Sequence, residues 1–388
     1  MPDPARLKVI DEILRQVPLI DGHNDLPWQY REYCHDNVNG LDLTRDHTGL
    51  EPKLVTDLPR LRQGHLGGQF WSVYVPAMPT NSDAVVAVLE QIDMVHRMVA
   101  KYPDSLELAL TADDVVRIHR EGKIASLIGM EGGHSIGNSL GVLRMTYALG
   151  ARYMTLTHML NNDWADSATD VPVHHGLTPF GEQIVHEMNR LGMLVDLSHV
   201  SDETMRAALK ITQAPVIFSH SAARALCHHA RDVPDDILKL VAANGGVVMV
   251  TFVPEYLTEI DRADETLVNA EKKRLKALYP DDKAKYVGHL AAWRSSHPDP
   301  RHATLLDVAD HMDHIRQVAG VDHVGIGSDY EGFGNPPAGL EDVSCYPSLL
   351  AELLKRGWSE EDIKKVAGLN ILRVLREAEK VSAQLSKP

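Results

Sequence analysis

The chain has 388 residues, a formal net charge of −15 and 44% hydrophobic residues, which excludes a mainly disordered or fibrous protein. The excess of acidic residues argues against a protein that binds nucleic acid or an anionic membrane surface. Three cysteines, Cys34, Cys227 and Cys345, form no even disulfide framework, which is typical of a reducing compartment. The sequence shows no apolar signal segment and no lipid-anchor tail, so we expect a cytoplasmic protein without a membrane anchor.

Short apolar segments alternate with helical stretches along the chain. In chain order, the strand-like segments cover residues 18–25, 70–77, 124–133, 151–159, 192–200, 215–221, 245–253 and 323–330. The later segments are nearly continuous apolar runs, as expected for parallel strands buried on both faces. Helix signals lie between these segments. Ser201 stands before a run of residues with helical spacing, as a helix N-cap does, and three other such runs end at Gly192, Gly245 and Gly320. Eight strands alternating with helices predict an α/β fold, a (β/α)₈ barrel of the TIM type.

The chain is longer than a barrel of this kind requires. A typical barrel has ~250 residues, so we expect one domain over residues 1–388 with a charged helical insertion at about 255–305. Residues 261–290 carry 13 charged side chains in 30. This segment is interpreted as a surface excursion, which serves as a lid or a subunit contact, or else is a solvated helix with no role.

The C-terminal ends of the barrel strands are where the active site is expected. The ionisable side chains at these ends are His23, Asp25, Glu131, His158, His199, His220 and Asp329. A single histidine at a strand end is more often a core residue than a ligand. Because six of the eight segments contribute at least one such group, we expect the groups to form one site.

The spacing of these groups favours a metal centre. His23 and Asp25 are two residues apart on a strand and therefore point to the same face. With His199 and His220 from distant strands, they offer nitrogen and carboxylate donors that suit Zn²⁺ better than Mg²⁺ or Ca²⁺. Glu131, which is followed by two glycines, is either a structural carboxylate or a bridge between two ions. Two ions ~3.5–4 Å apart can share a hydroxide and polarise a carbonyl.

Three further side chains suit roles in hydrolysis. Asp329, in Gly-Ser-Asp, suits a base that accepts a proton from the attacking water and returns it to a leaving amine. His158 suits a donor to the developing oxyanion. Arg231 suits capture of a substrate carboxylate, with a surface salt bridge as the alternative. Four other histidines are expected on solvated surfaces: His228, His229, His311 and His314.

At these residues the sequence resembles the membrane (renal) dipeptidase family of zinc metallopeptidases, in the amidohydrolase superfamily. The resembling segments are DGHNDLP (21–27), 129–158, 176–201, 214–221, 230–241 and 339–375. They follow the family order from about residue 17 to 375. The combination of motifs is highly specific.

The resemblance implies a dinuclear zinc dipeptidase on a distorted (β/α)₈ barrel, usually a homodimer. It implies that His23 and Asp25 bind one Zn²⁺ ion, that His199 and His220 bind the other, and that Glu131 bridges the two. It further implies a proton-transfer residue and substrate-binding residues, which are Asp329, His158, Arg231 and, in the substrate loops, Asn162 and Tyr256. Family members cleave dipeptides and tolerate a D-residue at the C-terminal side, so L-Xaa-L-Yaa and L-Xaa-D-Yaa are the expected substrates.

Two alternatives stay open. Another amidohydrolase would act on a lactone, a phosphoester or an amino-acid amide, and many such enzymes bridge their metals with a modified lysine on strand four. The corresponding segment 151–159 contains no lysine, which disfavours them. A non-catalytic barrel scaffold would be expected to lack a ligand or Asp329, and none of these residues is missing.

Overall fold

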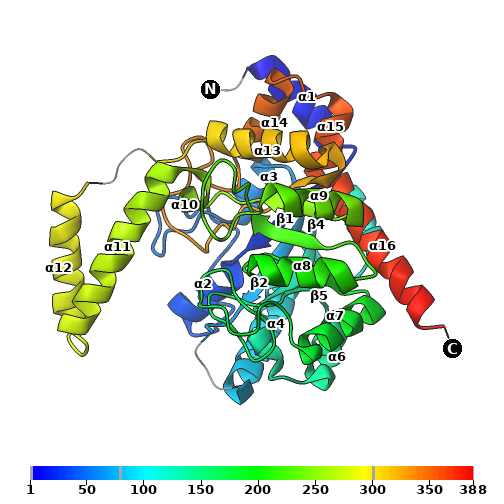
Figure 1. Cartoon of the computed structure of the whole chain (residues 1–388). Helices are drawn as coiled ribbons and strands as arrows, with labels where there is room; N and C mark the ends of the chain where they lie inside the picture. The colour runs from blue at the N-terminus through cyan, green and yellow to red at the C-terminus, as the bar shows by residue number, and fades with distance from the viewer. Residues whose placement is uncertain (1–2, 78–80, 299–301, 388) are drawn as a thin grey trace.

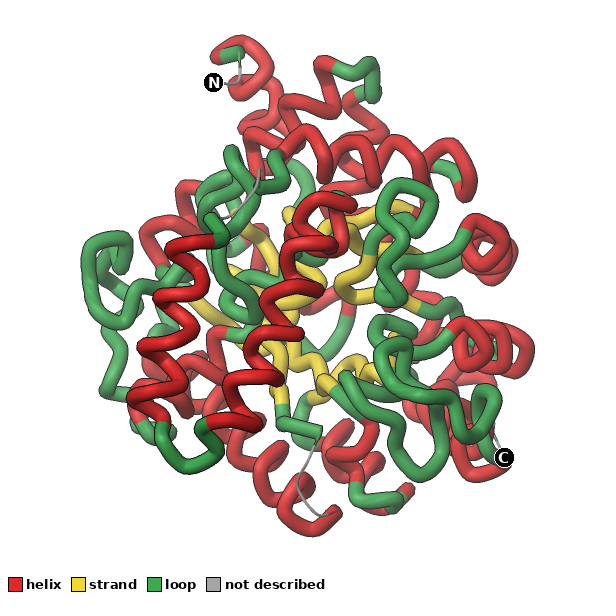
Figure 2. Tube along the Cα trace, turned by 60° about the vertical axis from the view of Figure 1, so that its left-hand side comes forward, coloured by secondary structure: helices red, strands yellow, loops and turns green. Residues whose placement is uncertain are grey.

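In the computed structural model, which describes residues 3–77, 81–298 and 302–387, parallel strands close into a barrel surrounded by helices (Figures 1 and 2). The strands are β1 (Leu19–Asn24), β2 (Leu66–Tyr74), β3 (Leu106–Leu108), β4 (Ile124–Glu131), β5 (Ala151–Thr155), β6 (Leu194–Asp196), β7 (Ile217–Ser221), β8 (Val247–Val250) and β9 (Val324–Ile326). They are hydrogen-bonded in the order β2-β1-β9-β8-β7-β6-β5-β4-β3. A pairing of β2 with β4, from Gly68↔Ala125 to Tyr74↔Glu131, closes the eight-stranded barrel and confirms the predicted TIM-type fold.

One strand was not expected from the sequence. β3 pairs with the first residues of β4, at Leu106↔Ile124, whereas β5 pairs with later residues of β4, beginning at Ile128↔Ala151. The barrel is therefore distorted at this point, where β4 exchanges one neighbour for another. Three residues are too few to show a periodic pattern, and this is why β3 escaped prediction.

Most of the helices pack around the outside of the barrel, and the others lie within the connections between strands. Their bounds are α1 (Pro4–Leu14), α2 (Leu26–Cys34), α3 (Leu58–Gln63), α4 (Asn81–Lys101), α5 (Ala112–Arg120), α6 (Leu140–Ala148), α7 (Pro179–Leu191), α8 (Asp202–Ile211), α9 (Asp235–Asn244), α10 (Pro254–Leu257), α11 (Glu259–Leu278), α12 (Lys283–Ser296), α13 (Leu305–Ala319), α14 (Tyr346–Lys355), α15 (Glu360–Lys364) and α16 (Asn370–Leu385). Short 3₁₀ turns cover Gly133–Ile136 and Val321–His323, and a π-helical turn covers Lys365–Leu369. Within the described residues, none of these helices combines the length and apolar character needed to cross a bilayer.

The predicted helix boundaries have clear physical causes. The Ser201 hydroxyl accepts a hydrogen bond from the backbone N–H of Thr204 and caps α8. Gly192 and Gly245 end α7 and α9 in the left-handed region, with φ of 84° and 82°, where glycine pays no steric penalty.

The region of the predicted charged insertion forms a helical hairpin, α11 and α12, which stands away from the barrel at the left of Figure 1. α12 has no buried residue, and the Asp264–Arg294 ion pair (2.6 Å) links the two helices. The insertion is therefore helical; α12 is solvated along its length, whereas α11 buries Asp261, Val268, Glu271 and Leu275.

Candidate metal centre and active site

The carboxyl ends of the strands open into a cavity of about 410 Å³. The residues that line it are Asp25, Trp28, Gln29, Glu32, Tyr74, Glu131, His158, Met159, His199, Tyr256, Asp329, Glu331 and Gly332. They come from the loops after β1, β2, β4, β5, β6, β8 and β9. Predicted site residues from distant parts of the sequence thus meet at the expected end of the barrel.

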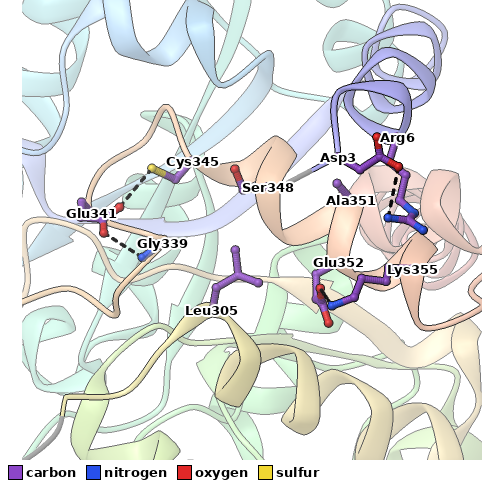
Figure 3. A pocket seen from close by; sticks show the side chains of 10 residues that line it. All are labelled: Asp3, Arg6, Leu305, Gly339, Glu341, Cys345, Ser348, Ala351, Glu352 and Lys355. Carbon is purple, nitrogen blue, oxygen red and sulfur yellow. Dashed lines mark hydrogen bonds and ion pairs between the residues drawn. The ribbon is translucent and has the colours of Figure 1, made fainter. Parts of the chain in front are cut away.

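A larger pocket, of about 650 Å³, lies between α1, α14 and the segment before α14 (Figure 3). None of the predicted site residues lines it. Its charges pair locally, as Figure 3 shows for Arg6 with Asp3 (3.3 Å) and for Lys355 with Glu352 (2.8 Å). The pocket at the strand ends is therefore the candidate active site.

The first group of potential metal ligands surrounds His23. Its Nε2 lies 3.4 Å from Asp25 Oδ2, 3.5 Å from Glu131 Oε2 and 3.9 Å from Asp329 Oδ1. Its other nitrogen, Nδ1, is 2.8 Å from the Tyr153 hydroxyl, which donates to the carbonyl of Gly22. The hydroxyl therefore accepts from Nδ1–H, and Nε2 faces the carboxylates.

The second group surrounds the other oxygen of the Glu131 carboxylate. Glu131 Oε1 lies 3.1 Å from His199 Nε2, 3.5 Å from His220 Nε2 and 3.7 Å from His158 Nε2. The Nε2 atoms of His199 and His220 are only 2.8 Å apart. Burial lowers the pKa of both rings well below the ordinary histidine value, and the nearby Arg231 adds to the effect for each. Two neutral rings that aim nitrogens at one another suit a shared cation.

Unpartnered polar atoms mark the same place. Within the described chain, the buried atoms His23 Nε2, Asp25 Oδ1 and His158 Nδ1 have no hydrogen-bond partner. Such atoms are costly unless a ligand completes them. The imidazole and carboxylate donors, with Glu131 common to both groups, fit two divalent ions bound side by side.

Asp329 has the environment of a proton-transfer group. Burial raises its pKa well above the ordinary carboxyl value, and the neighbouring carboxylates of Asp25 and Glu131 raise it further, against the opposing effect of His23. Its backbone is left-handed, with φ of 66°, and so is that of His199, at 71°. Non-glycine residues held in this region are characteristic of functional sites.

Arg231 is almost fully buried, so the structure rules out the alternative of a surface salt bridge. It donates from Nη1 to Ser221 Oγ (3.2 Å) and from Nη2 to the carbonyl of His220 (3.1 Å). Its guanidinium lies 5.2 Å from the Tyr256 ring, on which His229 stacks at 4.4 Å. His229 is thus packed rather than solvated as predicted, and burial lowers its pKa to about 4.

The sequence matches the family described as membrane dipeptidase (peptidase family M19) over residues 7–388. The chain belongs to the membrane dipeptidase family. It is 43% identical over 384 residues to dipeptidase 3 of Mus musculus, a match that covers 98% of this chain and 68% of the mouse protein. These findings confirm the resemblance drawn from the motifs and make the protein a metallopeptidase that acts on dipeptides.

Solved structures of membrane dipeptidases and related proteins have the same fold. The chain superimposes on the probable dipeptidase PvdM of Pseudomonas aeruginosa with a TM-score of 0.81, at 27% identity, covering 98% of this chain and all of that one. A metallopeptidase of Rhodobacter sphaeroides, solved with a phosphinate mimic of L-Ala-D-Ala, gives a TM-score of 0.75 at 22% identity, covering 93% of this chain and 99% of that one. The second likeness shows the fold alone.

Two predicted substrate residues of this membrane dipeptidase, Arg231 and Asn162, do not line the cavity. Asn162 accepts hydrogen bonds from the backbone N–H groups of Trp164 and Ala165 (3.0 and 2.9 Å) and donates to the carbonyl of Leu156 (2.8 Å). These hydrogen bonds of the Asn162 side chain stabilise the conformation of its own loop. Met159 of the same loop lines the cavity instead.

Sequence reasoning missed the residues that hold the ligands in place. Asp21 and Asp196 are completely buried and bond to the strand ends that carry the histidines, while Tyr153 orients His23. One signal was available in the sequence: each of the two aspartates interrupts an apolar strand close to a ligand, in LIDGH and LVDLSH.

Proposed function

We propose that this protein is a dinuclear zinc dipeptidase that hydrolyses L-Xaa-L-Yaa and L-Xaa-D-Yaa dipeptides. The observation that carries the proposal is Glu131, whose Oε2 lies 3.5 Å from His23 Nε2 and whose Oε1 lies 3.1 Å from His199 Nε2. Mixed imidazole and carboxylate donors favour Zn²⁺ over Mg²⁺ or Ca²⁺. The dipeptide mimic bound by the Rhodobacter sphaeroides metallopeptidase has a D-residue at its C-terminal side, which supports the proposed tolerance.

The metal pair would be held by two ligand sets that share Glu131, namely His23 with Asp25 and His199 with His220. When bound, the ions supply a Lewis acid for the peptide carbonyl and lower the pKa of an attacking water. Glu131 would keep the two ligand sets at a fixed separation, and Ser72 Oγ donates to its Oε2 (3.1 Å).

The other side chains would bind the substrate and move its protons. Asp329, with its raised pKa, would accept a proton from the attacking water and give it to the amine that leaves. His158, whose pKa burial lowers, would donate a hydrogen bond to the carbonyl oxygen as negative charge develops there. Arg231 and Tyr256 would receive the carboxylate of the C-terminal residue.

We also propose that the protein acts as a homodimer in the cytoplasm. The dimer rests on the family resemblance, and the location rests on the cysteine content. Light scattering on the purified protein and fractionation of the source cells test the two statements separately.

The decisive experiment is hydrolysis of a dipeptide panel by the zinc-loaded protein. The panel holds L-Xaa-L-Yaa and L-Xaa-D-Yaa pairs, with L-Ala-L-Ala-L-Ala and a C-terminally amidated dipeptide as controls. We expect both stereochemical series to be cleaved and both controls to be spared. The amidated dipeptide lacks the carboxylate that Arg231 would bind, and the tripeptide does not have its α-amino and α-carboxyl groups at the separation found in a dipeptide. Absence of cleavage by folded protein with two bound ions would instead favour a different amide or ester on the same site.

A further inference from the structure

The wall of the active-site cavity is strongly acidic. Of the described residues that line it, five carry carboxylates and none is a lysine or arginine. The five are Asp25, Glu32, Glu131, Asp329 and Glu331. Asp25 and Glu131 belong to the proposed ligand sets, and Asp329 lies beside them, so two carboxylates are left without a role in the hydrolysis.

Glu331 is occupied elsewhere. Its Oε1 accepts a hydrogen bond from the backbone N–H of Val55 (2.9 Å), and Thr56 bonds to the same side chain. Burial raises its pKa to about 7, so a large fraction of this side chain is uncharged at neutral pH. Its carboxyl group ties the loop after β9 to the segment before α3 and does not offer a full charge to a ligand.

Glu32 is different. It lies on α2, is exposed, and has no hydrogen-bond or ion-pair partner in the part of the chain that the structure describes. Arg31, the residue before Glu32 on α2, forms ion pairs with Asp36 (3.2 Å) and Glu90 and does not line the cavity. Glu32 therefore offers a full negative charge at the rim.

An aromatic wall lies beside this charge. Trp28, four residues before Glu32 on α2, lines the same cavity, and its ring meets Tyr74 edge to face at 4.8 Å. Residues four apart on a helix are neighbours on its surface. The guanidinium of Arg31 already lies 6.0 Å from the centre of this ring. A guanidinium or ammonium group next to Glu32 would meet the same indole, a favourable pairing for a cation.

The strand order decides which half of a dipeptide reaches this corner. Arg231 and Tyr256, the proposed carboxylate anchors, follow β7 and β8, whereas α2 follows β1, which is separated from β7 by β9 and β8 in the barrel. A dipeptide with its carboxylate at Arg231 and its scissile carbonyl at the metal centre directs its first residue toward α2. We propose that Glu32, with Trp28, selects dipeptides whose first residue is basic. This inference rests on the proposed dipeptidase function.

The test compares Arg-Ala with citrulline-Ala, two substrates of the same shape whose first side chains differ only in charge. For the zinc-loaded protein at low salt we expect kcat/KM to be about fivefold higher for Arg-Ala, the size of an exposed ion pair. Glu32→Gln should bring the ratio close to one without changing citrulline-Ala, and Glu32→Lys should reverse it. The preference should also weaken as salt is raised.

The matched control is Glu12→Gln, which removes an exposed carboxylate from α1 on the outside of the barrel and should leave the ratio unchanged. Equal cleavage of Arg-Ala and citrulline-Ala by the unaltered protein would overturn this inference and leave the dipeptidase function standing. A preference that survives Glu32→Gln would overturn it too, because another group would then carry the selectivity. If no dipeptide is cleaved at all, both proposals fall together.

Discussion

The two groups of potential metal ligands are positioned in the same way, by an aspartate that forms hydrogen bonds between two adjacent barrel strands. We call these two places the first and the second seam. At the first seam, between β1 and β9, Asp21 accepts hydrogen bonds from the backbone N–H (2.7 Å) and the hydroxyl (2.6 Å) of Ser328. This fixes the strand end that carries His23 against the loop that carries Asp329, whose N–H donates to the carbonyl of His23 (3.1 Å).

At the second seam, between β6 and β7, Asp196 has the equivalent position. One of its oxygens accepts from the backbone N–H groups of Ser198 and Ser219, each at 3.0 Å. The Ser198 hydroxyl in turn accepts from the N–H of His220 (3.1 Å). The adjacent residues His199 and His220 are thereby brought together, with their Nε2 atoms 2.8 Å apart.

The seams differ in how they are anchored to the outer helices. Tyr346 of α14 donates to Asp21 Oδ2 (2.7 Å), the oxygen that also accepts from the Ser328 hydroxyl, whereas Asp196 Oδ2 has no hydrogen-bond partner among the residues that the structure describes. The segment after β7 is held instead by His311 of α13, which accepts from the N–H of Ala223 (3.0 Å). A phenol keeps its proton at neutral and acidic pH, whereas a histidine titrates, so His311 adds an acid-sensitive contact that the first seam does not have.

The largest effect on activity is expected from a change at Glu131, whose carboxylate lies beside the potential ligands of both seams. Glu131→Ala removes the carboxylate that both ligand groups share, so we expect bound zinc to fall from two ions to at most one per chain. Dipeptide kcat/KM should fall by at least about 10³-fold. Elemental analysis after dialysis and a steady-state assay measure the two effects, with Glu12→Ala as the control. Retention of two ions would show that Glu131 is not the bridge.

Asp329→Asn should separate chemistry from metal binding. Loss of a positioned proton-transfer group typically costs about 10²–10⁴-fold, so kcat should fall in that range while two zinc ions stay bound. The variant keeps the size of the side chain and the backbone hydrogen bond to His23. A near-normal kcat would assign the proton transfer to another group, and a loss of metal would make Asp329 a ligand of the first group.

Asp21→Asn and Asp196→Asn test the two seams separately. Each change replaces an anionic acceptor with a neutral amide. In Asp21→Asn the amide N–H hydrogens would face the Ser328 and Tyr346 hydroxyls, and in Asp196→Asn the carbonyl oxygen would accept from the two backbone N–H groups without a charge. We expect zinc affinity to fall by about 10–100-fold in each variant. Asp21→Asn should weaken the ion near His23, and Asp196→Asn the ion near His199. Competition with a chromophoric chelator gives both affinities. If either variant lost both ions equally, the seams would not act independently.

The sequence predicted which potential ligands would lie together because each stands at the end of an apolar run, where the barrel fold itself directs side chains inward. It could not identify the seams. Asp21 bonds to Ser328, 307 residues away, and no local pattern reports such a contact. The sequence could not show the role of Asn162 either. An asparagine that bonds within its own loop and one that contacts substrate cannot be distinguished from the local sequence.

His311 shows the limit in the opposite direction. The helical pattern of residues 305–319 places it among polar neighbours and predicts a solvated ring. In the structure it is 1% exposed, because the segment after β7 and the end of α10 pack over it, and its Nε2 donates to the carbonyl of Leu257 (3.0 Å). His311 is buried because two segments that are distant in the sequence pack over it, and the pattern of its own helix does not report this.

The smallest expected effect concerns stability rather than chemistry, and it follows from that burial. Burial lowers the pKa of His311 to about 4, against ~6.5 in an unfolded chain. As pH falls below ~6.5, the unfolded chain binds a proton that the folded histidine does not, so the free energy of unfolding decreases until about pH 4. The linkage amounts to about 3 kcal/mol at most.

His311→Gln keeps a polar side chain that can bond to Ala223 or Leu257 but removes the titration. We expect the variant to be about 1 kcal/mol less stable than the parent at about pH 7.5 and to lose less stability than the parent on acidification to about pH 5. Urea unfolding at the two pH values measures the difference, with His186→Gln, an exposed histidine on α7, as the control. Zinc released by acid affects all three proteins alike and therefore cancels. Parallel pH dependence of parent and variant would mean that the second seam owes no acid sensitivity to His311.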